Sequence, residues 1–519
     1  MISSTDNNKP SSSFENVRGD VTKIAKESGI GLSGAFSGIL LHYLLVMVLT
    51  RFLSPTDYGT FVLGQSVLNI LLVFVLFGTP RVLDRFIAFF NASGDLGKTK
   101  TLIYGVFRIV LAAGVIIGLL TYFLAEFIGQ FLFTNPQLSS ILKIMSISLP
   151  MTAFIQLVSF TFIGFKELRY QGYVEYLAYP LLMICFATIA LLGGYGLITW
   201  TWMYVVSLFG SSLLGLWFFS RITLRLLCKT AKKTISVREI ASFSWPVCVN
   251  ALLIIIIGHA AVLILGYFRP PEEVAVYRIY FLLASILSVV HDSIGRIYKP
   301  VVSGHVAAMQ KEQIREIYRR VSKWSITINV LFIGLFITLG QTLIQTLFSR
   351  DYGGAFYSFL ILLCGQFVNS ALGHQGKSLE AFGNVRLLLL NGVTLLLVTL
   401  IFSLLLIPRY GVYGAAIASA SGLIAANLLA YTEVQSLYRL NLLNARYFRV
   451  VVLLLATISA LLAIRWFIGS GKVGLANALA AAGFLLIYVP LAIGVICDEH
   501  DRWILRGVYD KIRGHGKHR

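Results

Sequence analysis

The chain has 519 residues, of which 57% are hydrophobic and only 13% are charged, and its formal net charge at pH 7 is +20. An ordinary soluble domain has about 25% charged residues, so this composition, with a mean hydropathy of +0.80, excludes that class. It indicates a protein that lies largely within a lipid bilayer.

Residues 1–29 are polar and contain the run SSTDNNKPSSS. Low hydrophobicity and many Ser and Asn residues are typical of a disordered segment, whereas a secretory signal peptide would need an apolar core at this place. We therefore predict a cytosolic tail and an amphipathic lead-in, followed by a retained first span.

From about residue 30, apolar stretches recur almost to the C-terminus. A helix needs about 20 residues to cross roughly 30 Å of hydrocarbon, and each stretch is about that long. The sequence thus predicts an all-α polytopic membrane protein of about 14 transmembrane helices, at about 30–52, 58–78, 102–128, 139–164, 172–193, 198–220, 240–267, 274–293, 323–347, 354–374, 385–407, 411–433, 447–467 and 475–496.

The basic residues are distributed unevenly between the predicted loops. If the N-terminus is cytosolic, every inner loop carries more Lys and Arg than its outer neighbours, as the positive-inside rule requires. Both termini are then predicted to be cytosolic. Topology and contact with anionic lipid account for most of the positive charge, so no nucleic-acid partner is expected.

The five cysteines stand singly, with no CxxC motif and no Cys/His cluster: Cys185, Cys228, Cys248, Cys364 and Cys497. This spacing indicates neither a disulfide framework nor a zinc site. No metal or other cofactor is expected.

Landmarks of the first half of the chain recur 214 to 217 residues later. Phe52 to Pro55 corresponds to Phe268 to Pro271, and Tyr195-Gly196 corresponds to Tyr410-Gly411. Because six spans separate the copies, both halves have the same orientation in the membrane. The predicted organisation is a tail and lead-in at 1–29, six-helix bundles at 30–222 and 240–435, a basic cytosolic linker at 223–239, two additional helices at 436–497 and a basic cytosolic tail at 498–519.

The loop after the first span is a tight hairpin in this prediction. Pro55 cannot continue a helix, and Asp57 can cap the next one. Its second copy, from Arg269 to Val274, has neither the Asp nor the Gly of the first. Arg51 remains a candidate cation at the outer end of a substrate path.

The stretches LTRFLSPTDYGTFVLG, FGTPRVLDRFIAFF and YGVYGAAIASASGLIAANLL, with the six plus six plus two spans, resemble the polysaccharide-exporter (Wzx-type flippase) branch of the multidrug/oligosaccharidyl-lipid/polysaccharide (MOP) transporter superfamily. The resemblance implies a flippase that is not an enzyme. Such a protein moves a polyprenyl-pyrophosphate-linked oligosaccharide from the inner to the outer leaflet, for cell-surface glycan assembly, by alternating access between two bundles.

The resemblance also implies a central cavity lined by spans one, two, seven and eight, and a place in the plasma membrane of a prokaryote. The expected partners are the lipid-linked anionic oligosaccharide and membrane lipids, with a glycan polymerase or glycosyltransferase of the same pathway as a further candidate.

Span eight carries the clearest row of polar residues. Arg278, Ser285, Asp292 and Arg296 are spaced 7, 7 and 4 residues apart, which places them along one face of a helix, with His291 beside them. Charges within a bilayer usually face a cavity or a partner. We expect cavity lining, the alternative being an Asp292–Arg296 pair and an Arg278 that reaches the outer interface.

Span two offers Gln65 and Asn69, one helical turn apart, and leads to Arg81 and Arg85. Arg81 corresponds to Arg296 in the repeat, so each half supplies an arginine at the predicted cytosolic mouth. The planar guanidinium suits a pyrophosphate because it donates two hydrogen bonds at once. Ordinary positive-inside anchoring is the alternative for both arginines.

Two histidines are nearly equivalent in the repeat, His42 in span one and His259 in span seven. They are candidates for binding headgroup oxygens or for titration during transport, and the alternative is a neutral packing role. Secondary candidates are interhelical hydrogen bonds at Asn250, Asn369, His374 and Asn391, and structural pairs at Glu126 and Glu175.

The sign of the expected substrate follows from the membrane potential, which favours outward movement of an anion by about 2.3 kcal/mol per charge per 100 mV. Spans one, two and seven have no acidic residue in their interiors. This favours an anionic substrate over the nearest alternative, a cation-coupled multidrug antiporter of the same fold. A major-facilitator carrier fits fourteen spans less well, and a membrane glycosyltransferase or polymerase would need a sizeable outer loop.

Overall fold

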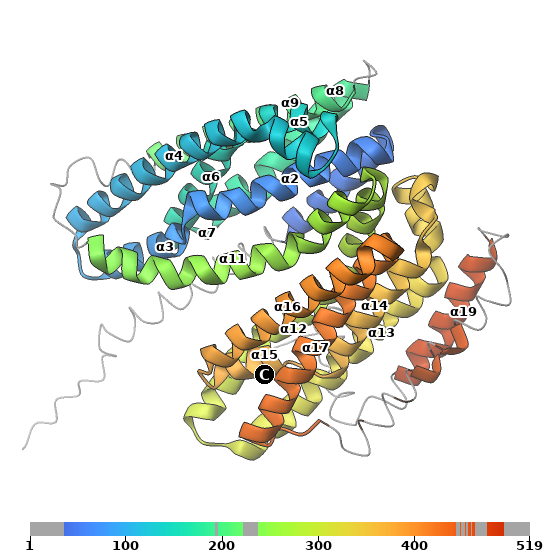
Figure 1. The fold of residues 1–519 in the computed structure, drawn as a ribbon. Coiled ribbons are helices and arrows are strands. Elements are labelled where there is room, and N and C mark those ends of the chain that lie inside the picture. The colour runs from blue at the N-terminus through green and yellow to red at the C-terminus, as the bar shows by residue number, and fades with distance from the viewer. Residues whose placement is uncertain are drawn as a thin grey trace, which may run out of the picture. The chain divides into compact units, whose positions relative to one another are not determined.

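The computed structural model describes residues 36–191, 196–221 and 237–442, parts of 447–461, and residues 475–492. Helices connected by short turns make up this part of the chain, and no strand occurs in it (Figure 1). The predicted tails and most of the linker at 223–239 lie outside the described residues. The chain divides into two compact units, Met1–Ile256 (unit 1) and Ile257–Arg519 (unit 2).

The all-α, multi-pass membrane character predicted from the sequence is confirmed. Eight helices among the described residues are long and apolar enough to cross a membrane, or ten if two bent helix pairs are counted as one span each. The predicted number of fourteen is not established by this count. The additional helix at 447–467 is described only in part.

Unit 1 packs its helices around an apolar core that includes Leu83, Ile87, Leu157 and Phe162, all fully buried. The main helix pairs in this core are α3 with α6, α4 with α6 and α6 with α9. In chain order, unit 1 contains a helix Phe36–Phe52, α2 (Pro55–Leu76), α3 (Thr79–Ala92), α4 (Leu96–Glu126), η1 (Phe127–Leu132), α5 (Pro136–Ser146), α6 (Ser148–Gly164), α7 (Leu168–Gln171), η2 (Gly172–Ala178), α8 (Tyr179–Leu191) and α9 (Leu197–Phe219).

Unit 2 follows from within α11 (Val237–Phe268), which starts in unit 1. In unit 2, α12 contacts α13, α14, α15 and α17, while α16 packs closely on α17, where small residues such as Gly414 and Ala415 are buried. Its further elements are α12 (Pro271–Ala307), α13 (Lys311–Leu347), η4 (Arg350–Gly353), α14 (Phe356–Ala371), α15 (Gln375–Ala381), α16 (Val385–Tyr410), α17 (Val412–Tyr438) and α19 (Leu475–Leu491).

Helix boundaries keep the offset seen in the sequence repeat. Both α2 and α12 begin with a proline in the first turn, Pro55 and Pro271, and the residue before each proline is extended. The first residues of α9 and α17, Leu197 and Val412, are likewise 215 positions apart. These helix starts therefore keep the spacing of the sequence repeat.

The helices extend beyond the predicted spans on the side predicted to be cytosolic. There α12 continues to Ala307, α13 begins at Lys311, and the predicted loop after span two forms the helix α3. A search for apolar runs misses such segments because only one of their faces is apolar. In α3, Leu83 and Ile87 are fully buried while Arg85 is exposed.

Candidate functional site

The polar row predicted in span eight lies on one continuous helix, α12. Arg278 and Ser285 are half-buried and Asp292 and Arg296 are exposed, so unit 2 covers none of the four completely. At 1.5 Å per residue, the row from Arg278 to Arg296 extends about 27 Å along the helix, close to the thickness of the hydrocarbon core. We call these four residues the polar stripe.

The opposite face of α12 is held by side chains of four neighbouring helices. It buries large residues such as Tyr280 and Leu287, both fully inaccessible. Four hydrogen bonds run along this face: Tyr277 with Ser419 (2.7 Å), Ser288 with Gln366 (2.8 Å), His291 with Ser325 (2.9 Å) and Tyr298 with Ser378 (2.8 Å). These contacts fix the rotation of α12 and leave the stripe uncovered by the helices of unit 2.

Within the stripe, the predicted alternative of an Asp292–Arg296 pair is wrong. Neither side chain forms a hydrogen bond or salt bridge with any residue that the structure describes. Arg278 interacts electrostatically with His259 of α11, which is half-buried. The stripe thus presents two arginines and one carboxylate with unused hydrogen-bonding capacity.

His291 lies on the packed face of α12 and not on the stripe. Only 9% of the residue is accessible, and its ring stacks on His374, with ring centroids 4.0 Å apart. The ring of Tyr298 also stacks on the ring of His374, with ring centroids 5.6 Å apart. His291 is therefore placed to pack unit 2 and not to reach solvent.

A basic group that the sequence did not suggest lies beside Arg296. Glu380 of α15 forms salt bridges with Lys299 (2.8 Å) and Lys377 (3.8 Å). The absence of a side chain at Gly295 lets Lys377 lie against α12, since an added Cβ would be 3.1 Å from its Cγ. One carboxylate for two lysines leaves this end of the stripe positive. Lys377 is 81 residues from Arg296 in the sequence, so only the fold shows this group.

In unit 1, Arg81 and Arg85 lie on α3, and both are exposed. Arg81 forms a salt bridge with Asp84 (3.2 Å) and lies 5.2 Å from the ring of Phe160. Burial raises the pKa of Asp84, and its hydrogen bond with Arg81 opposes that rise. Arg81 therefore has a partner that its repeat equivalent, Arg296, does not have.

The remaining predicted site residues of unit 1 lie on two helices. His42 and Arg51 are exposed on the helix Phe36–Phe52, and Gln65 and Asn69 are half-buried on α2. The side chain of Gln65 lies beside the hydroxyl of Tyr179. In unit 1 the structure thus brings together Gln65 and Tyr179. Arg51 and Arg81 are not brought together, because they lie on the two helices that precede and follow α2.

The secondary candidates have mixed outcomes. Asn391 donates to Glu433 of the next helix (2.8 Å), and Glu126 pairs with Lys143 (2.5 Å), as predicted. Glu175 accepts from Gln171 (3.0 Å). The prediction was wrong for His374, whose ring nitrogens are buried without a hydrogen bond in the described chain, because the site offers stacking partners only. Asn250 and Asn369 form no interhelical hydrogen bond with any described residue.

Residues 24–304 match the model of a protein family described as polysaccharide biosynthesis protein. This segment includes unit 1 from residue 24 onward, the start of unit 2 and nearly all of α12. No curated protein matches the chain.

Solved structures show the same fold at low sequence identity. A lipid II flippase MurJ in an inward closed conformation matches with a TM-score of 0.68 and 13% identity, over 89% of this chain and 98% of that one. An inward-facing multidrug resistance MATE family transporter of the MOP superfamily matches with a TM-score of 0.64 and 14% identity, over 79% and 98%. A MOP superfamily transporter from Pyrococcus furiosus, described as having a binding pocket of reverse polarity, matches with a TM-score of 0.56 and 12% identity, over 81% and 95%.

Proposed function

The chain belongs to the polysaccharide biosynthesis protein family and has the fold of MOP transporters, and from this we propose that it is a flippase for a polyprenyl-pyrophosphate-linked oligosaccharide. Its direction of transport is from the inner to the outer leaflet, by alternating access between the two halves of the repeat. The proteins and families that it resembles in fold are transporters and flippases, and the proposal assigns it no catalytic step.

The observation that carries this proposal is the polar stripe of α12. A sugar headgroup cannot cross hydrocarbon unaided, because each unsatisfied polar group costs several kcal/mol. The polar stripe is about 27 Å long and therefore offers hydrogen bonds across most of the roughly 30 Å of the hydrocarbon core. Arg278 and Arg296 mark its two ends, and guanidinium groups suit a pyrophosphate because they donate two parallel hydrogen bonds.

The positive end of the stripe gives the transport a starting point. Arg296, Lys299 and Lys377 lie near one another, with Glu380 between the two lysines. In the proposed topology, with both termini cytosolic, this group faces the cytosol and attracts the pyrophosphate. The membrane potential then favours outward movement of a doubly charged group by roughly 4.6 kcal/mol at 100 mV.

The same topology agrees with the distribution of basic residues, and we place the protein in the plasma membrane of a prokaryote. The other candidate binding residues of this proposal are His42, His259, Gln65, Asn69, Arg81, Arg85 and Arg51, with Asp292 on the stripe and His291 as a residue that holds α12 in position. A glycan polymerase or glycosyltransferase would use the glycan after transport.

The test is leaflet exchange in vesicles. The purified protein is reconstituted with synthetic polyprenyl-pyrophosphates that carry several candidate glycans, and sugar in the outer leaflet is measured with a membrane-impermeant lectin. We expect exchange above that of empty vesicles, reduced about tenfold by Arg296→Ala, which corresponds to about 1.4 kcal/mol. Arg320→Ala, which removes a half-buried arginine paired with Glu316, is the matched control. Absence of exchange for all the glycans would contradict the proposal.

A cation-coupled multidrug antiporter is the second candidate, because a multidrug resistance MATE family transporter shares the fold with a TM-score of 0.64. A cation carrier needs an accessible carboxylate, and Asp292 is the acidic residue of the stripe. If this candidate holds, Asp292→Asn abolishes drug efflux from cells while the lipid-linked sugar assay shows no exchange. The flippase proposal expects the opposite result, with sugar exchange and no drug efflux.

A further inference from the structure

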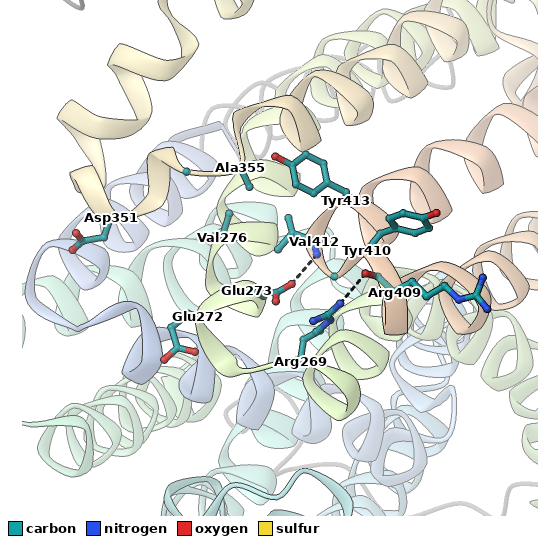
Figure 2. Close-up of a pocket in the computed structure, with 12 residues that line it drawn as sticks. Arg269, Glu272, Glu273, Val276, Asp351, Ala355, Arg409, Tyr410, Val412 and Tyr413 are labelled. Carbon is teal, nitrogen blue, oxygen red and sulfur yellow. Dashed lines mark hydrogen bonds between the residues drawn. The ribbon is translucent and has the colours of Figure 1, made fainter. Parts of the chain in front are cut away.

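A cavity of about 350 Å³ lies in unit 2 where α11 joins α12 and α16 joins α17 (Figure 2). Arg269, Glu273 and Tyr413 are among the residues that line it. The predicted topology places this end of the unit on the outer side of the membrane. None of these three residues belongs to the polar stripe, so the cavity is distinct from the site proposed above.

The floor of the cavity is a rigid clasp built from two charged side chains. The guanidinium of Arg269 donates to the carbonyl oxygens of Pro408 and Arg409, each at 3.0 Å, at the end of α16. The carboxylate of Glu273 accepts from the backbone N–H of Val412 at 2.9 Å, at the start of α17. The positive Arg269 caps the C-terminal end of α16 and the negative Glu273 caps the N-terminal end of α17, as the helix dipoles favour. Both side chains therefore bind to the protein itself.

Gly411 lies between the two helix ends that this clasp holds, at a position suited to glycine. Its φ of +52° lies in the left-handed region, which favours glycine. An added Cβ would also overlap with the Glu273 carboxylate, so that side chain would have to move. The turn between α16 and α17 is therefore held in one conformation, and the side chains before and after it have fixed positions.

In unit 1, the residue equivalent to Glu273 makes a different contact. Asp57, the repeat equivalent of Glu273, accepts from its own helix cap, Ser54, at 2.9 Å. An added Cβ at Gly196, the equivalent of Gly411, would meet nothing within 4 Å. Asp57 thus caps its own helix, whereas Glu273 connects α12 to the start of α17.

The rim of the cavity presents groups with unused binding capacity. Tyr410 is 57% exposed and Tyr413 is 37% exposed, and both rings border the cavity. The guanidinium of Arg409 is exposed and forms no hydrogen bond with any described residue. Figure 2 shows these three residues on one side and Glu272 and Asp351 on the other.

We propose that this cavity binds a saccharide of one or two residues at the outer end of unit 2. Aromatic rings offer flat apolar surfaces for the C–H face of a pyranose, while the guanidinium and carboxylates exchange hydrogen bonds with its hydroxyl groups. The volume suits a small ligand of this size. The role rests on the proposed function, since a glycan headgroup that has been moved outward arrives at this end and is held there before release.

Saturation-transfer NMR on the full-length protein in nanodiscs tests the binding directly. The probes are the methyl glycosides of glucose, galactose, N-acetylglucosamine and glucuronic acid. We expect saturation of the ring C–H protons of at least one probe, reduced at least fivefold by Tyr410→Ala and by Tyr413→Ala. Tyr357→Ala is the matched control, because Tyr357 is 67% exposed and does not line the cavity.

The outcomes separate this inference from the flippase proposal. No saturation of any probe, or saturation that Tyr410→Ala and Tyr413→Ala leave unchanged, overturns the saccharide site, and the two tyrosines are then interfacial anchors. If the wild-type protein exchanges lipid-linked sugar in the vesicle assay but binds no sugar in the NMR experiment, only the saccharide site in the cavity is contradicted. If sugar binding depends on the two tyrosines but the vesicles show no exchange, the saccharide site is supported and only the flippase proposal is contradicted.

Discussion

The two helices that follow the first helix of each repeat start alike and then differ. Pro55 begins α2 and Pro271 begins α12, but α2 ends after 22 residues whereas α12 continues for 37. Between α2 and α3, Phe77 and Gly78 have φ values of 46° and 74°. The corresponding residues of α12 remain helical, and this part of the helix carries the end of the polar stripe that contains Asp292 and Arg296.

A neighbouring helix accounts for the break in unit 1. The hydroxyl of Ser244, on α11, donates to the carbonyl oxygen of Phe77. The backbone of α11 lies so close to Gly78 that an added Cβ would be 2.5 Å from the carbonyl oxygen of Ser244. The glycine of α12 near this level, Gly295, makes room for Lys377 instead. One repeat thus contains a turn supported from outside, and the other a straight helix with a polar face.

The largest effect is expected for Gly78→Ala. A left-handed residue with a side chain costs roughly 1–2 kcal/mol, and the contact with the backbone of α11 adds to this. We expect a loss of about 3 kcal/mol in the free energy of unfolding, measured by titrating SDS into mixed micelles. Gly94→Ala is the control, because Gly94 has a φ of 71° but open space around it, and only the first cost applies. Equal losses for both variants would show that α11 does not support the turn.

A smaller effect is expected for Ser244→Ala. The variant leaves the part-buried Phe77 carbonyl without its side-chain donor, which costs about 1 kcal/mol. The same SDS titration measures it. Ser303→Ala on α12 is the control, because that hydroxyl is exposed and bonds only within its own helix, to Lys299. A loss of stability no greater than that of the control would show that the Ser244 hydroxyl does not stabilise the turn between α2 and α3.

The sequence predicted the parts of this comparison that depend on local patterns. The offset between Pro55 and Pro271 and the stripe from Arg278 to Arg296 follow from the repeat and from helical spacing, and the structure contains both. The break at Gly78 depends on Ser244, 166 residues away, and no local pattern in the sequence indicates it.

The errors at the candidate site have the same origin. His291 lies one position from Asp292 in the sequence, but one residue is a rotation of about 100° on a helix, enough to move it to the packed face. The sequence shows neighbours along the helix, whereas Lys377 and His374 reach α12 from α15 and its N-cap position.

Gly295→Ala tests whether α12 is a straight helix held by packing. Alanine favours a helix over glycine by about 0.8–1 kcal/mol, but the added Cβ would lie 3.2 Å from the Nδ1 atom of His374. We expect these effects to cancel within about 0.5 kcal/mol. Gly304→Ala, on the same helix with nothing within 4 Å, has only the gain and is expected to stabilise the protein. A loss at Gly295 as large as that at Gly78 would mean that α12 also needs a special backbone conformation.

The last comparison concerns the equivalent arginines, Arg81 and Arg296, of which only Arg81 has a salt-bridge partner among the described residues. Burial holds the pKa of Asp84 above its ordinary value of 3.8, although Arg81 opposes the rise. The folded protein therefore binds this proton more readily than the unfolded chain, so stability falls as the pH rises through the folded pKa.

Asp84→Asn removes this titration, and we expect a shallower decline of the melting temperature as the pH rises from 4 towards neutrality. At neutral pH the change stays within about 1 kcal/mol, because the side chain of Arg81 is 63% exposed and solvent weakens the pair. Arg81→Ala leaves burial unopposed and should make the decline steeper. Parallel pH profiles for the wild type and both variants would contradict this account of Asp84. Such profiles would also mean that the interaction with Asp84, which distinguishes Arg81 from Arg296, does not affect stability.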